Sequence, residues 1–279
     1  MKNILKIMLM MITIFTIAGS AVYAAEIPVS DQDQLITSSD WTEISNLQDE
    51  MKKEEPDATI DYDKALKVYV DCNLIKLQTA DTKKLTSALE SANYVWVIPF
   101  KMEKTYGMFT VAKGLPLREE AKSVLTKAEQ EEVKNHAGKW MITETAEHTV
   151  EPYYDILLEK REALSDCTRV VLVGSQPGMR QPVALGMDDE TARIWISLGY
   201  QYPVMEKIPE TQNVESGVYS FESVADISDT YIEDSEVSTG AGVQSRSSMK
   251  YVAGIGIIVI GSILILSVLK KKKLEQSGE

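Results

Sequence analysis

The sequence predicts an exported α+β domain, in which helices are mixed with an antiparallel sheet, followed by one C-terminal transmembrane helix. Two observations support this prediction. Segments with the periodicity of helices are interspersed with strands, and the strands come in neighbouring pairs joined by turn residues instead of alternating strictly with helices. In addition, one uninterrupted apolar run lies near each end of the chain.

The N-terminal run has the order of a secretory signal peptide, which we place at residues 1–24. Two lysines precede an apolar stretch at residues 7–18, and small residues follow it. The stretch is too short to span the hydrocarbon core of a bilayer. We expect cleavage after Ala24, with Ala25 as the alternative position, and an uncleaved anchor as the competing interpretation.

Residues 25–60 are expected to form an N-terminal helical extension. A helix near residues 40–53 is predicted because its apolar residues recur at spacings of three and four, and Pro56 follows it. These residues are Trp41, Ile44, Leu47 and Met51.

The main domain is expected at residues 61–200. Apolar and polar residues alternate from residue 65 to residue 72, which predicts a half-buried and antiparallel strand. Asp81 can cap the short helix that follows. Two strands are predicted next, at residues 94–100 and 106–113.

The second half of this domain starts with a helical region at residues 118–137, in which Thr126 and Glu129 form a capping box. A strand at 139–145 and a helix from Pro152 to Ser165 are expected after it. Turn signals then separate three predicted strands, at residues 168–173, 180–187 and 191–198.

The order helix, strand, turn, strand occurs twice, at residues 81–113 and at residues 152–187. A diverged helix-hairpin duplication would produce this order. The residues of the two segments hardly match, and a helix followed by a hairpin is a common arrangement, so the duplication is a hypothesis only.

The C-terminal part predicts a linker and a membrane anchor. Periodicity fades after residue 200, and residues 201–250 are acidic and contain serine and glycine, as expected for a linker or stalk. Docking of residues 218–232 back on the domain is the alternative for that part of the segment. Residues 251–269 carry no charge, and a helix of this length covers the roughly 30 Å of a bilayer core. A membrane-flanking basic cluster follows at once: Lys270, Lys271, Lys272 and Lys273.

Lysines on one flank of a membrane helix mark its cytoplasmic side. We therefore expect a single-pass protein of the cell membrane, with residues 25–250 outside and a short basic cytoplasmic tail at residues 270–279. The basic start of the signal and the lack of an Asn-x-Ser/Thr acceptor suit a bacterial cell envelope. Ten inner residues are too few for an output domain, so a membrane-protein partner is expected.

The charge excludes some partners. The chain has 29 basic and 42 acidic residues, and residues 25–250 alone have 23 and 40. A surface this acidic repels nucleic acid, which we exclude as a partner. Plain solubility is the competing explanation of the charge.

Cys72 and Cys167 are the two cysteines, and both lie in the part that we expect to be exported. An oxidising compartment would permit a disulfide between them. Two separate buried thiols are the alternative, because spacing along the chain does not show whether the Cβ atoms approach.

The sequence identifies no catalytic residue, no cofactor site and no metal site. Only His136 and His148 could activate a nucleophile, and neither belongs to a metal-binding motif. The leading hypothesis is a non-catalytic binding or accessory module of the envelope, with a small ligand or wall polymer as its target. The alternatives are a membrane-tethered extracellular hydrolase that uses unidentified carboxylates, and a structural envelope protein.

Overall fold

The computed structural model describes residues 27–148, 150–174, 176, 179, 181–200, 202, 204–209 and 213–227. The predicted signal peptide with Ala24 and Ala25, the membrane helix at 251–269 and the lysine cluster at 270–273 lie outside these residues. Within the described ranges, no helix has the length and apolar character needed to cross a membrane.

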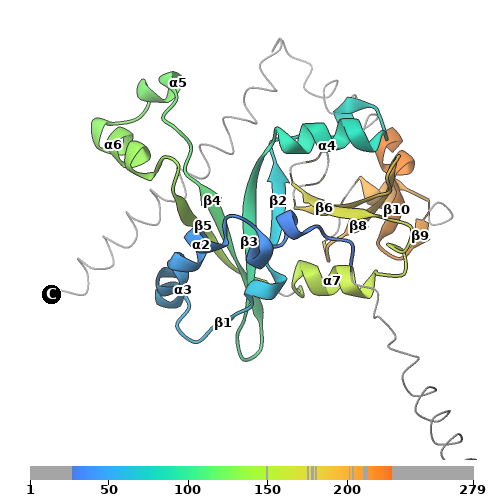
Figure 1. Cartoon of the computed structure of the whole chain (residues 1–279), viewed down its shortest axis with the longest axis horizontal. Helices are drawn as coiled ribbons and strands as arrows, with labels where there is room; N and C mark the ends of the chain where they lie inside the picture. The colour runs from blue at the N-terminus through green and yellow to red at the C-terminus, as the bar shows by residue number, and fades with distance from the viewer. Residues whose placement is uncertain are drawn as a thin grey trace, which may run out of the picture.

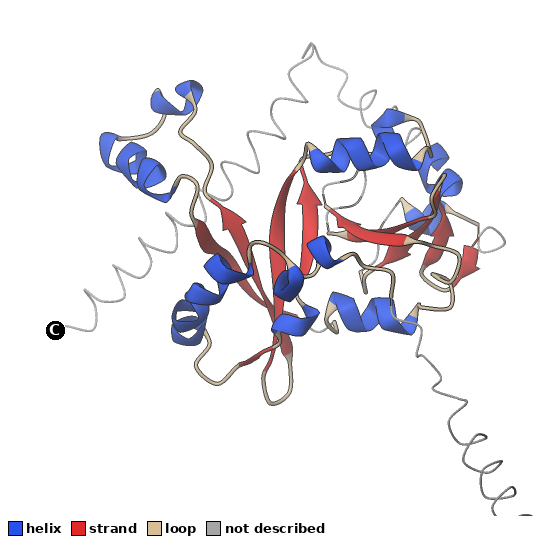
Figure 2. Cartoon of the chain, in the orientation of Figure 1, coloured by secondary structure: helices blue, strands red, loops and turns tan. Residues whose placement is uncertain are grey.

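The described chain is an α+β domain built on one mixed sheet of ten strands (Figures 1 and 2). The strand order is β5-β4-β3-β2-β6-β7-β8-β10-β9, and β1 pairs with β3 beside this path. The strands are β1 (Thr59–Ile60), β2 (Leu66–Val70), β3 (Asn93–Lys101), β4 (Tyr106–Lys113), β5 (Trp140–His148), β6 (Arg169–Val173), β7 (Val183–Met187), β8 (Ala192–Ser197), β9 (Asn213–Glu215) and β10 (Val218–Ser220).

The two halves of the sheet meet at a parallel pair. β2 runs parallel to β6, with Val68 opposite Leu172, whereas the other strand pairs of the described residues are antiparallel. The strand predicted at residues 65–72 was expected to pair in an antiparallel way, which is correct for its pairing with β3 and wrong for its pairing with β6. The alternation of apolar and polar residues along a strand shows that one of its faces is buried. It carries no information about the direction of a neighbouring strand that lies about a hundred residues away in the sequence.

Short helices cover the sheet. The α-helices are α2 (Trp41–Ile44), α3 (Gln48–Glu54), α4 (Thr82–Glu90), α5 (Glu119–Lys122), α6 (Lys127–His136) and α7 (Tyr153–Glu159). The 3₁₀ turns are η1 (Asp31–Asp33), η2 (Leu35–Thr37), η3 (Ser45–Leu47), η4 (Tyr62–Lys64), η5 (Ile75–Leu77) and η6 (Met205–Lys207). The helix predicted at 40–53 is thus interrupted by η3, and the helix predicted from Pro152 ends six residues early, at Glu159.

Apolar clusters fill both faces of the sheet. On one face, Tyr69 of β2 belongs to a cluster over β6, β7 and β8, and Trp96 of β3 belongs to a second cluster over β3, β4 and β5. On the opposite face, Val68 of β2 and Val97 of β3 join a third cluster. The alternation of side chains along each strand accounts for this division.

The two helix–hairpin units cover opposite faces. Leu85 and Leu89 of α4 belong to the same cluster as Tyr69, whereas Tyr153 and Leu157 of α7 belong to the same cluster as Val68. If the hairpin β3–β4 is superposed on the hairpin β6–β7 by a rotation in the plane of the sheet, α4 and α7 still lie on opposite faces of the sheet. The arrangement of the two units adds no support to the duplication hypothesis.

The folded domain extends beyond residue 200. Val204, Val218, Phe221 and Val224 are buried, the last in a helical segment at residues 221–227. The linker predicted at 201–250 therefore starts too early, because residues up to 227 contribute to the core. Sequence periodicity missed them because β9 and β10 have only three residues each.

The N-terminal segment is also part of the domain and enters the sheet between β2 and β6. The Val170 N–H donates to the Pro28 carbonyl at 2.7 Å, and the Leu35 N–H donates to the Ala65 carbonyl at 3.1 Å. Asp33 is buried at this junction, with its side chain only 2% exposed.

The Asp33 carboxylate lies in an ionic cluster. It accepts hydrogen bonds from the Ser30 hydroxyl at 2.6 Å, from the Tyr69 hydroxyl at 2.7 Å and from Arg169 Nη2 at 2.9 Å. Lys67 Nζ lies 3.8 Å from it and 4.5 Å from the centre of the Tyr94 ring. Burial lowers the pKa of Lys67, and Asp33 opposes this shift.

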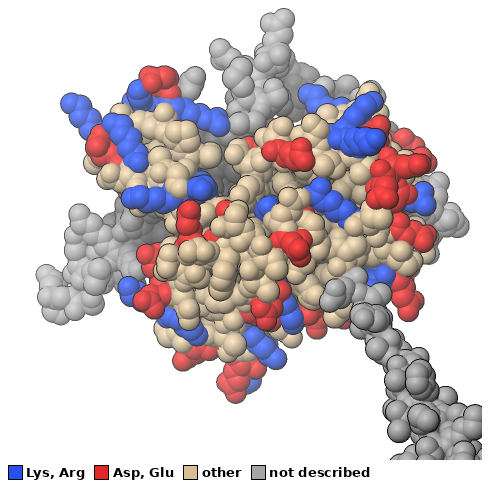
Figure 3. Space-filling view, in the orientation of Figure 1, with Lys and Arg blue, Asp and Glu red and all other residues tan. Residues whose placement is uncertain are grey.

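An arm projects from the sheet between β4 and β5 (Figure 1). It comprises residues 114–139, carries α5 and α6, and has no buried residue among those whose burial is described. Its predicted capping box is confirmed, because the Thr126 hydroxyl accepts from the Glu129 N–H while the Glu129 carboxylate accepts from the Thr126 N–H. Lysine and arginine side chains are prominent on the arm in Figure 3.

Candidate functional site

A cavity lies where β8 changes its neighbour. Ile194, Trp195 and Ile196 pair with β10, but the preceding residues turn to the segment before α4, where the Ala192 N–H donates to the Ala80 carbonyl at 2.7 Å. β10 and this segment diverge at that point. The gap between them is a cavity of about 490 Å³.

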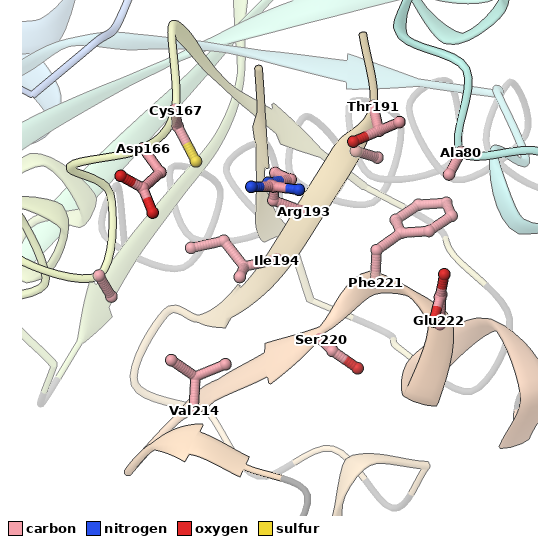
Figure 4. Close-up of a pocket in the computed structure, with 12 residues that line it drawn as sticks. Ala80, Asp166, Cys167, Thr191, Arg193, Ile194, Val214, Ser220, Phe221 and Glu222 are labelled. Carbon is pink, nitrogen blue, oxygen red and sulfur yellow. The ribbon is translucent and has the colours of Figure 1, made fainter.

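The cavity combines apolar and charged walls (Figure 4). Ile194, Val214 and Phe221 supply apolar surface, and Phe221 is held against Trp195 by ring stacking, with centroids 5.6 Å apart. Arg193 of β8 lies between Asp166 and Glu222 in this view. These three charged side chains come from three separate segments of the chain.

Arg193 is oriented by a carboxylate behind it. Its Nε lies 3.2 Å from Asp188 Oδ2, and its side chain is half exposed. Backbone hydrogen bonds from Thr191 and Glu190 hold the pKa of Asp188 below its ordinary value, at donor–acceptor distances of 2.6 and 2.8 Å. Asp188 therefore stays ionised and anchors one edge of the guanidinium, which leaves its terminal nitrogens free to contact a ligand.

The two acidic side chains of the cavity are exposed and unpaired. Within the described part of the chain, the carboxylates of Asp166 and Glu222 make no hydrogen bond and no ion pair. Each can accept hydrogen bonds from a ligand without breaking a contact of the fold. With Arg193 they give the cavity two negative groups and one positive group.

Cys167 also lines the cavity, but as a protonated thiol. Burial raises the pKa of the Cys167 thiol to about 11, and burial likewise raises that of Cys72 to about 11. A thiol that holds its proton at neutral pH is a poor nucleophile. Cys167 therefore contributes a small apolar surface to the wall.

The disulfide between Cys72 and Cys167 is not formed, because both residues are free cysteines in the structure. Cys72 packs against the cluster that contains Tyr69, and Cys167 belongs to the cluster on the opposite face. The sheet separates the two thiols, so the alternative of two separate cysteines is the one that the fold adopts.

Sequence reasoning missed the charged residues of this cavity. Arg193 interrupts an apolar strand, which was the one local signal, but an exposed strand position also accepts arginine without any function. Asp166 and Glu222 lie 56 residues apart in loop and helix and gave no signal. His136 lies on the arm, and no histidine lines the cavity. Among the described residues, no group of three or more ligand side chains could hold a metal ion.

No protein-family model, no curated protein and no solved structure matches this chain.

Proposed function

We propose that this chain is a single-pass, membrane-anchored binding module of the cell envelope, whose cavity beside β8 takes a small zwitterion such as an amino acid or a short peptide. The observation that supports this most is that Arg193 and two unpaired carboxylates line the same cavity. A guanidinium recognises a carboxylate, and Asp166 and Glu222 can accept from an ammonium group.

The size and walls of the cavity fit this ligand class. About 490 Å³ lies within the range of small-molecule sites, and apolar walls with a few charged groups are typical of them. Ile194, Val214 and Phe221 offer contact surface for an apolar side chain of the ligand.

The residues that line the cavity favour binding over catalysis. Its thiol stays protonated, and its one serine hydroxyl, Ser220, donates to the Ser223 hydroxyl at 2.7 Å. General acid–base catalysis needs a group whose proton transfers near the working pH.

The expected topology places this cavity outside the cell and connects it to the membrane. Glu222 belongs to the helical segment 221–227, after which the chain continues toward the predicted membrane helix at 251–269. A ligand held by Glu222 would contact the helical segment that leads to the linker. Because the predicted inner tail is short, the ligand-bound state would be read by a membrane-protein partner.

The test is calorimetric titration of the full chain in nanodiscs with a panel of tripeptides that differ in the apolar side chain. Peptides with both termini free should bind, and C-terminal amidation or N-terminal acetylation should each weaken binding. Arg193→Gln should reduce affinity for the free carboxylate by about tenfold, because a partly exposed charged hydrogen bond contributes about 1.4 kcal/mol. It should not change affinity for the amidated peptide.

Arg118→Gln provides the matched control, since Arg118 is an exposed arginine on the arm and lies outside the cavity. Absence of binding by any peptide, or equal loss in both variants, would refute the proposal. Hydrolysis of a peptide or wall polymer by the same preparation would instead favour the tethered hydrolase.

A further inference from the structure

Three consecutive residues of β8 line the cavity: Ala192, Arg193 and Ile194. Successive side chains of a regular strand point to opposite faces of the sheet, so this arrangement needs an irregularity. The register with β7 supplies one. Met187 lies opposite Ala192, and its neighbour Gly186 lies opposite Ile194. Arg193 is thus the extra residue of a β-bulge, and a bulge of this kind re-aims a side chain.

The cavity carries more negative than positive charge. Arg193 is already paired, because its Nε lies 3.2 Å from Asp188 Oδ2. Asp166 and Glu222 line the same cavity and form no ion pair with any of the described residues. The Cys167 thiol in this wall responds to the nearby charges. Burial raises its pKa, Arg193 lowers it, and Asp188 and Asp166 raise it further.

A ligand with a single ammonium group leaves one carboxylate of the cavity without a counter-charge. The carboxylate of such a ligand contacts Arg193, and its ammonium group donates to either Asp166 or Glu222. When the ligand fills the cavity, it displaces water from the other acid as well. This displacement costs free energy unless a second cation compensates the charge. The complementary ligand therefore has two positive groups and one carboxylate.

The apolar wall of the cavity suits a basic side chain with an aliphatic stem. Side chains of the lysine type pack their methylene groups on apolar surface while the ammonium group stays at a polar site. Ile194, Val214 and Phe221 offer such a surface, and Val214 is 58% exposed. Glu222 directly follows Phe221 in the chain, so a carboxylate adjoins the apolar wall (Figure 4).

We infer that the cavity beside β8 selects a cationic ligand, namely an amino acid or short peptide with a basic side chain. Its two positive groups contact Asp166 and Glu222, its carboxylate contacts Arg193, and its aliphatic stem lies along the apolar wall. This inference rests on the proposed function, because it specifies which amino acids or peptides the same cavity takes.

The experiment is calorimetric titration of the full chain in nanodiscs of zwitterionic lipid with two tripeptides, alanyl-lysyl-alanine and alanyl-norleucyl-alanine. The two peptides share a four-carbon stem and differ in the ammonium group at its end. The lysine peptide should bind about tenfold more tightly at low salt, because it makes one more charged hydrogen bond. High salt should reduce this advantage, because the charged groups lie at an open site.

Two isosteric variants test the role of the acids. Asp166→Asn and Glu222→Gln should each abolish the advantage of the lysine peptide, because one carboxylate then remains for two ammonium groups. Neither should change the affinity for the norleucine peptide much, since its single ammonium group still finds an acceptor. Glu103→Gln is the matched control, because Glu103 is exposed between β3 and β4 and lies outside the cavity. It should leave the advantage intact.

The outcomes separate this inference from the proposed function. Equal binding of the two peptides, with both termini still required, would overturn the inference and leave the proposed function standing. An advantage of the lysine peptide that survives in both cavity variants, or that disappears in Glu103→Gln, would also overturn the inference. Absence of binding by either peptide would refute the proposed function and the inference together. Circular dichroism checks that the variants fold, which is expected because both acids are exposed.

Discussion

Replacing Asp33 by asparagine should destabilise the domain, because Asp33 compensates two cations at the junction of the two half-sheets. The carboxylate is 2% exposed and contacts Arg169 at 2.9 Å, with Lys67 at 3.8 Å. The side chains of these two cations are only 17% and 11% exposed. The Asp33→Asn substitution keeps the volume of the side chain and removes its charge.

The expected loss follows from what remains buried after the substitution. Removing one partner of a buried ion pair costs roughly 3–5 kcal/mol, because the other charge stays desolvated. Asp40 also faces Lys67, and the amide oxygen of an asparagine can still accept from Tyr69, so we expect the lower end, about 3 kcal/mol. This is a large part of the stability of an ordinary domain.

Urea unfolding of the fragment 25–227, followed by tryptophan fluorescence, measures this loss. Trp96 is a suitable probe, because its ring centre lies 5.2 Å from Lys67 Nζ. Asp63→Asn is the control, since Asp63 is exposed, and it should change stability by less than about 0.5 kcal/mol. Adding Lys67→Met to Asp33→Asn should recover part of the loss, because one of the two uncompensated cations is then removed.

Equal stability of Asp33→Asn and the wild type would refute the reasoning. It would mean that water or local rearrangement solvates Lys67 and Arg169 at no cost. A loss that Lys67→Met does not reduce would place the whole effect on Arg169.

Two further predictions concern the thiols and a glycine. Unreduced, unfolded protein should titrate two free thiols, and the folded fragment should react with a thiol reagent at pH 8 roughly a hundredfold more slowly than the unfolded chain, because burial raises the pKa of Cys72 and Cys167 to about 11. These folded-state pKa values lie above the unfolded ones, so the contribution of the two thiols to stability is full below about pH 9 and is lost as pH rises toward 11. Replacing both cysteines by alanine should therefore flatten the decline of stability over this pH range. An unchanged decline would contradict the prediction. Gly107→Ala should lower the free energy of unfolding of the fragment by about 2 kcal/mol in the same urea assay, because an added Cβ would collide with the Phe100 ring. Gly174→Ala is the control and should lower it less, because its added Cβ meets the nearest neighbouring atom at 3.6 Å. Equal effects of the two substitutions would show that the Phe100 ring moves freely.

The local elements of the fold were predictable from the sequence. The strands at 94–100 and 106–113, the capping box at Thr126 and the helix start at Pro152 all form close to where they were expected. Periodicity and capping act over a few residues, so the sequence reports them directly. The apolar runs at the two ends determine the expected membrane topology in the same way, and that topology stays a prediction.

Pairings between distant segments could not be predicted. The parallel contact of β2 with β6 joins residues roughly a hundred positions apart in the chain, and the contact of Asp33 with Arg169 joins residues still further apart. The placement of Cys72 and Cys167 on opposite faces likewise depends on how distant segments pack. The candidate site has the same origin, because Asp166, Arg193 and Glu222 come together only when β8 exchanges one neighbour for another. Residue type and spacing determine which local element forms, whereas the choice of partner depends on the burial that the complete chain achieves, and that was decided only in the tertiary structure.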